Sequence, residues 1–318
     1  MLELNESFLS QLAEEYKIAS GIKTDEHISL LREIESYDEE EIVTILNYFV
    51  SLETNPDVLL HIIRTLAKYD CRRSVDIFTE MLLWKEKFKQ YTQNIDDYLK
   101  VRCTLAVALG NIKDNKAVLP LLYVLNNKNE NYKLRLACAE ALGRIGDKYA
   151  VAPLIDVVSD EGEKSVYLRE SAAKALGMLG DFSAVEPLVT ILETKKGIID
   201  KFSFLKEKIV EAIGRLGGRD DRTIKALKTA LLDEASYVRS GAIEALSEID
   251  DPRVLPLIEK MFEDEDEEVL RSAVTAIYNL QGAEYTAKLL ESDNISQQCK
   301  EEFEIILKED CDEEGYDE

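Results

Sequence analysis

The chain has 318 residues, 46% of them apolar, and a formal net charge of -24 that comes from 63 acidic and 39 basic side chains. DNA, RNA and anionic membranes are bound through basic surfaces, so the negative charge argues against all three as partners. Two explanations of the acidity are open: it keeps a long exposed surface soluble, or it attracts a basic protein partner. No apolar run approaches the roughly 20 residues of a membrane span, and the acidic first residues do not resemble a signal peptide, so we expect a single soluble domain in the cytoplasm.

The first 57 residues are irregular, and we expect them to form cap helices. Apolar side chains at helical spacing predict one amphipathic helix over residues 2–19 and another over residues 39–52. Neither carries the repeat described below, and the terminal unit of a stacked array has to present a polar outer face. A first weak copy of the repeat begins at Val58, and its second helix is predicted over residues 74–83.

The segment 84–100 places large side chains on one face of a predicted helix. It holds the only tryptophan of the chain and is locally basic. Because aromatic side chains dominate the energetics of protein interfaces, this face is a candidate protein-binding surface, made of Trp84, Phe88, Tyr91 and Tyr98. The alternative is that the stripe packs on the first repeats as an inserted core helix.

From residue 101 a pattern of an aliphatic residue, a basic residue and then small residues recurs at nearly constant spacing. The bases are Arg102, Arg135, Arg169, Lys206 and Arg239, and the marker alanines are Ala108, Ala141, Ala175, Ala212, Ala245 and Ala276. A glycine and an aspartate follow, and then a second apolar helix. Such a hairpin cannot bury its own apolar face, so a row of hairpins has to stack into a solenoid.

The recurring bases could form a row of ligand-binding side chains along the stack. The simpler account is structural, because a base repeated once per unit can bridge neighbouring units, while aspartates such as Asp147 and Asp181 cap the second helices. The glycine pairs 143/146 and 177/180 are expected to terminate helices rather than to hold phosphate. Cys138 occupies a core position of the repeat.

A second insertion, residues 193–204, lies between two repeats. Every such connection falls on one edge of a stack, where insertions often build a binding surface. We expect protein-binding residues here as well, namely Lys195, Lys196, Phe202 and Phe204. The acidic run 263–268 lacks the glycine of a calcium loop and is expected to be solvated.

The chain holds no P-loop, no G-x-S-x-G and no H-E-x-x-H motif, and its five cysteines form no C-x-x-C pair. We therefore expect no catalytic residue, no metal site and no cofactor.

Two copies of the unit agree almost position for position: Arg135, Ala141, Leu142, Gly146, Asp147 and Pro153 in one, and Arg169, Ala175, Leu176, Gly180, Asp181 and Pro187 in the other. These units resemble the HEAT-repeat family, and more narrowly the short bacterial repeats named after phycobilisome lyases. The resemblance implies an all-α fold, a right-handed α-solenoid of stacked antiparallel helix hairpins, with repeats over residues 58–290. Residues 291–308 are then a C-terminal capping helix, and residues 309–318 an acidic tail that we expect to be disordered.

That repeat serves many unrelated tasks, so it indicates little about activity. We expect a non-enzymatic interaction scaffold or adaptor that uses the solenoid groove and the insertion-bearing edge to bind another protein or peptide. The alternative, which follows from the family name, is a bilin lyase or chaperone-like factor acting on a phycobiliprotein. The oligomeric state stays open.

Overall fold

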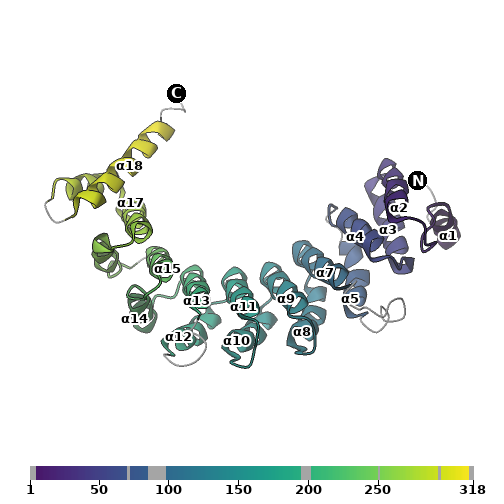
Figure 1. The fold of residues 1–318 in the computed structure, drawn as a ribbon, viewed down its shortest axis with the longest axis horizontal. Helices are drawn as coiled ribbons and strands as arrows, with labels where there is room; N and C mark the ends of the chain where they lie inside the picture. The colour runs from purple at the N-terminus through teal and green to yellow at the C-terminus, as the bar shows by residue number, and fades with distance from the viewer. Residues whose placement is uncertain are drawn as a thin grey trace. The chain divides into compact units, whose positions relative to one another are not determined.

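The computed structural model describes residues 5–69, 72–84, 98–194, 202–249, 251–292 and 295–314, and side chains as far as residue 308. In these ranges every regular element is a helix and none is a strand, which confirms the all-α class (Figure 1). Contacts divide the chain into two compact units, Met1–Pro153 and Leu154–Glu318.

The first unit begins with helices α1 (Glu6–Glu15), α2 (Thr24–Leu31), α3 (Glu39–Leu52), α4 (Pro56–Leu66) and α5 (Val75–Leu83). Helix α3 has the bounds expected from the sequence, and Asp38 and Glu41 form a capping box at its start. Helix α1 is shorter than predicted, because Lys17 and Ala19 adopt positive φ angles that end it. Helix α2 was not predicted.

The regular repeats of the first unit are α7 (Leu99–Ile112), α8 (Val118–Asn126) and α9 (Tyr132–Ile145), and α10 (Val151–Ser159) runs across the division between the units. First helices pack on first helices, α4 on α7 and α7 on α9. Gly110 of α7 allows this approach, since a Cβ there would lie 2.7 Å from the Cα of Ala141.

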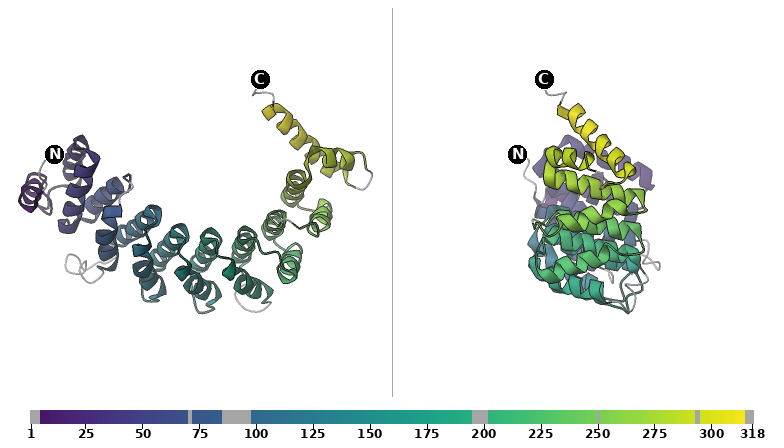
Figure 2. Two further views of the ribbon diagram at one scale, coloured as in Figure 1. Left: turned by 180° about the vertical axis from the view of Figure 1, so that it is seen from behind. Right: turned by 90° about the vertical axis from the view of Figure 1, so that its left-hand side faces the viewer.

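The second unit consists of α11 (Val166–Leu179), α12 (Val185–Glu193), α13 (Ser203–Leu216), α14 (Asp221–Ala230), α15 (Ser236–Ser247), α16 (Leu255–Glu259), α17 (Glu267–Leu290) and α18 (Gln297–Glu314). Its first helices α11, α13, α15 and α17 pack in a row, and Figure 2 shows the second helices beside them as a separate layer. Helix α18 continues to Glu314, so the prediction of a disordered tail is wrong for residues 309–314.

The hairpin turns follow the sequence chemistry. Gly146 and Gly180 end α9 and α11 in the left-handed conformation, with φ of 78° and 74°. Asp181 then accepts a hydrogen bond from the N–H of Ser183 at 2.9 Å. Gly177, in contrast, does not terminate a helix: it lies inside α11, where a Cβ would come within 3.1 Å of the Cα of Ala212. Gly143 likewise lies inside α9.

Three of the recurring arginines are buried, and each tethers its helix to the preceding second helix. The Nε groups of Arg102, Arg135 and Arg169 donate to the carbonyls of Leu82, Leu125 and Val158, at 2.7 to 2.8 Å. Each acceptor lies in the last turn of its helix, where carbonyls have no partner within the helix. The bases therefore join consecutive helices, as the structural account predicted.

Candidate functional site

The connections that lead into the first helices of the second unit bring aromatic side chains to one edge. In three successive first helices, the residue two positions before the recurring base is aromatic: Tyr167, Phe204 and Tyr237. We use the name aromatic edge for these three side chains together with Leu232. Phe204 is 59% exposed and Leu232 is 81% exposed. The rings of Phe204 and Tyr237 stack at 4.6 Å with an interplanar angle of 9°. The exposed Phe204 ring, held parallel to the half-buried ring of Tyr237, is a platform for a further flat or cationic group.

A pocket of about 970 Å³ lies alongside this pair, between the end of α12, the start of α13 and helix α14. Its lining mixes apolar and charged groups: Leu192, Glu193, Thr194, Ser203, Lys206, Lys225, Leu232, Asp233 and Glu234 among them. A space of this size admits several side chains of a partner.

The bases at this edge are neutralised by carboxylates of the same edge. Lys206 pairs with Asp233 at 2.8 Å, and the Nε and Nη2 groups of Arg239 donate to the two carboxylate oxygens of Asp264 at 2.8 and 2.7 Å. These hydrogen bonds to Asp264 raise the pKa of Arg239.

Other carboxylates on the three connections are Asp160, Glu161, Glu163, Glu234, Glu263, Glu265, Asp266, Glu267 and Glu268. The Ser236 hydroxyl, followed by backbone N–H groups of α17, lowers the pKa of Asp266, so this carboxyl is ionised at neutral pH. The edge is therefore both aromatic and acidic.

The predicted residues of the second insertion fall partly on this edge. Phe202 and Phe204 are both exposed, whereas Lys195 and Lys196 lie outside the described residues. Sequence reasoning missed Tyr167 and Tyr237. The signal that could have found them is the shared position two residues before the base, which becomes visible only when the repeats are aligned with one another.

The residues predicted around the first insertion are less informative. Phe88 and Tyr91 lie outside the described residues. Trp84 ends α5 and is partly exposed. Tyr98 is only 2% exposed and donates its hydroxyl to the carbonyl of Thr54. Its ring therefore belongs to the core of the first unit, and the prediction that Tyr98 contacts a partner is corrected by its burial.

The three cysteines whose side chains the structure describes are free thiols that are buried or partly buried. Cys138 is fully buried, as its repeat position predicted, and burial raises its pKa. Burial also raises the pKa of Cys299 to about 12. Across the described ranges, no group of three His, Cys, Asp or Glu side chains is arranged to hold a metal ion. Among the same residues no helix combines the length and apolarity needed to cross a membrane.

Comparison with known proteins was made on sequence and on structure. The family model of HEAT repeats matches residues 85–166, 120–205 and 198–278. No curated protein matches the chain at a significant level.

Among solved structures, the complex of CpcE and CpcF of phycocyanin lyase from Nostoc sp. PCC7120 is 25% identical, with a TM-score of 0.45 over 66% of this chain and 89% of that chain. A Kap121p mutant is 15% identical with a TM-score of 0.55, covering 95% of this chain and 37% of its own. A designed armadillo repeat protein in complex with peptide (KR)4 is 18% identical, with a TM-score of 0.46 over 64% of this chain and 99% of that chain.

Proposed function

The chain belongs to the HEAT-repeat family, and from this premise we propose that it is a non-enzymatic interaction scaffold of a bacterial cytoplasm whose aromatic edge binds a basic, extended segment of another protein. The observation that carries the proposal is the exposed Phe204 ring, which stacks on the half-buried ring of Tyr237. An aromatic ring that is exposed to solvent contributes little to folding, but it offers a large apolar contact to a partner.

The acidic charge of the aromatic edge favours a basic partner. Lys206 and Arg239 are held in ion pairs with Asp233 and Asp264, so the edge presents a net acidic charge to an incoming chain. A lysine or arginine side chain can lie over the Phe204 ring while its charge faces these acids. Complementary charge of this kind mainly sets specificity and the rate of association.

The test is the binding of a fluorescein-labelled peptide of about twelve residues in which arginine alternates with leucine. We expect Phe204→Ala to weaken binding by about tenfold or more. Phe182→Ala is the matched control, because Phe182 is also 59% exposed in the same unit but lies in a hairpin turn, away from the connections into the first helices. Equal effects of the two substitutions, or no measurable binding of the arginine peptide, would contradict the proposal.

The hypothesis of a bilin lyase or chaperone-like factor stays a prediction. It predicts a stable complex between this protein and a purified phycobiliprotein, and a change in the absorbance of a free bilin on mixing. Size-exclusion chromatography and visible spectroscopy test both expectations, and failure of both removes the hypothesis. The two insertions also keep their prediction of protein binding at Trp84, Phe88, Tyr91, Lys195 and Lys196.

A further inference from the structure

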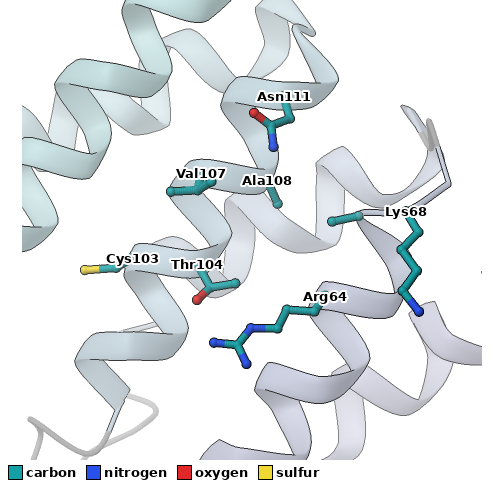
Figure 3. Close-up of a pocket in the computed structure, with 8 residues that line it drawn as sticks. Arg64, Lys68, Cys103, Thr104, Val107, Ala108 and Asn111 are labelled. Atoms are coloured by element: carbon teal, nitrogen blue, oxygen red, sulfur yellow. The ribbon is translucent and has the colours of Figure 1, made fainter. Parts of the chain in front are cut away.

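A separate pocket lies in the first unit, between α4 and α7. It has a volume of about 400 Å³, and we name it the α4–α7 pocket: Arg64, Ala67 and Lys68 line one side, and Cys103, Thr104, Val107, Ala108 and Asn111 line the other. Figure 3 shows the side chains of Arg64 and Thr104 directed into the space between the two helices. It shares no residue with the aromatic edge.

The floor of this pocket is apolar where other repeats are charged. Val107 lies five residues after the base of its repeat, and the same position in the later repeats holds Glu140, Lys174, Glu211 and Glu244. Val107 is 36% exposed. The change from charge to valine opens an apolar surface at this one junction.

The thiol in the wall is also uncharged. Burial raises the pKa of Cys103 to about 11, so the group is a neutral thiol at physiological pH and a poor nucleophile. The wall of the pocket is therefore suited to packing rather than to covalent chemistry.

The rim of the pocket is cationic. Within the described part of the chain Arg64 forms no ion pair, and Lys68 reaches only Glu35, at 3.9 Å on the surface. Beyond the lining residues, Arg144 donates to the side-chain oxygen of Asn111 at 3.2 Å and lies 4.0 Å from Glu140. Burial lowers the pKa of the neighbouring His61, Arg32 and Lys68 lower it further, and Glu35 raises it. The residues that line the pocket include two bases and no carboxylate, which is a local reversal of sign in a chain with a net charge of -24.

We propose that the α4–α7 pocket docks an acidic segment of a partner protein, which places one aliphatic or aromatic side chain against Val107 while its carboxylates meet Arg64 and Lys68. Exposed ion pairs are individually weak, so a lone small anion is held poorly by this rim. A segment that combines carboxylates with an apolar anchor uses both the rim and the floor. This pocket would bind an acidic segment, whereas the aromatic edge is proposed to bind a basic one. The proposal for the pocket does not depend on the proposal for the aromatic edge.

The experiment measures fluorescence anisotropy of a labelled peptide of about twelve residues in which glutamate alternates with leucine, titrated with the full chain. Arg64→Glu is expected to weaken binding by about tenfold. Lys174→Glu is the matched control, because Lys174 is an exposed base at the position of α11 that Arg64 occupies on α4. It should leave the affinity unchanged, as should Phe204→Ala, which separates this site from the aromatic edge. Both charge reversals are on exposed side chains, and circular dichroism checks that each variant is folded.

Two further results decide whether the apolar floor takes part. Val107→Glu should weaken binding as Arg64→Glu does, and an all-glutamate peptide of the same length should bind more weakly than the alternating one. Failure of the alternating peptide to bind, equal binding by the Arg64→Glu variant, equal affinity for the all-glutamate peptide, or displacement by millimolar inorganic phosphate would each overturn the proposal.

Discussion

The groove between neighbouring first helices is built differently in the two units. Between α4 and α7 of the first unit, it is open and bordered by Arg64 and Lys68. On α13 of the second unit, side chains at the matching positions of the repeat form a continuous chain of ion pairs: Glu207 with Lys208 at 3.1 Å, Lys208 with Glu211 at 2.9 Å and Glu211 with Arg215 at 2.7 Å. The positions are equivalent in the repeat, so the difference comes from the side chains alone.

The buried arginines show the opposite contrast. In the first unit, Arg102 forms a nearly buried bidentate pair with Glu130 at 2.9 and 3.1 Å. In the second unit, Arg169 is 1% exposed, and its Nη1 has no hydrogen-bond partner among the described residues. Burial accordingly lowers the pKa of Arg169. At these positions, Arg102 is paired while Arg64 forms no ion pair among the described residues, whereas Arg169 lacks a partner at Nη1 while the side chains on the surface of α13 are paired. The same repeat therefore supports two kinds of surface.

The largest expected effect tests the buried arginines. Arg102→Met strands the carboxylate of Glu130 and the carbonyl of Leu82, and should lower the free energy of unfolding by about 3–5 kcal/mol. Arg169→Met removes hydrogen bonds to Val158 but also an unpaired donor, and should lower it by about 1–2 kcal/mol. Urea denaturation followed by circular dichroism measures both. Equal losses of unfolding free energy in the two variants would indicate that Arg169 also has a carboxylate partner, and the two buried arginines would then not differ.

A smaller effect concerns the approach of the helices. Gly110→Ala in α7 places a Cβ 2.7 Å from the Cα of Ala141, and should lower the free energy of unfolding by about 1–3 kcal/mol. Gly241→Ala in α15 meets no atom closer than 3.8 Å, and should raise it by about 0.5–1 kcal/mol through helix propensity. Thermal unfolding of the two variants separates them. A destabilised Gly241→Ala variant would mean that α13 and α15 pack more closely than the structure indicates.

The smallest effect is electrostatic and depends on pH. Burial, then repulsion from Glu211, Glu248 and Glu207, raises the pKa of Glu244. A carboxyl whose folded pKa is raised destabilises the fold when it is ionised, and that penalty disappears as the pH falls through the folded pKa toward the unfolded value. Glu244→Gln should therefore raise Tm by about 1–2 °C at neutral pH, and this gain should shrink near pH 4.5 and at high salt.

Glu140→Gln is the control for the pH experiment. Glu140 lies at the same repeat position of α9 but 4.0 Å from Arg144, so its removal should give no gain in Tm at neutral pH. A comparable gain in both variants would attribute the effect to net charge rather than to the local cluster of glutamates.

The sequence predicted the repeats well because each hairpin depends on residues close together in the chain. Apolar spacing, the glycine that ends a helix and the aspartate after it are local signals, and they located α3, α5 and the turn at Gly180 and Asp181. The aspartate, however, caps the short 3-10 turn Phe182–Ala184, whereas the prediction was that it caps the second helix α12 itself. The structural role of the recurring base was predicted on the same grounds. Helix α2 was missed because its residues carry no copy of the repeat, and Gly177 was misread because its neighbour, Ala212, belongs to the next first helix.

The sequence by itself therefore determined an all-α array, the order of its hairpins, and the exposed aromatic Phe204. Only the tertiary structure showed that Phe204 stacks on Tyr237, that Tyr98 is buried, and that Arg64 and Val107 share a pocket. The physical reason is that helix formation is governed by neighbours within a few residues, whereas a binding surface is assembled from side chains of different repeats, whose contacts are set by packing between helices.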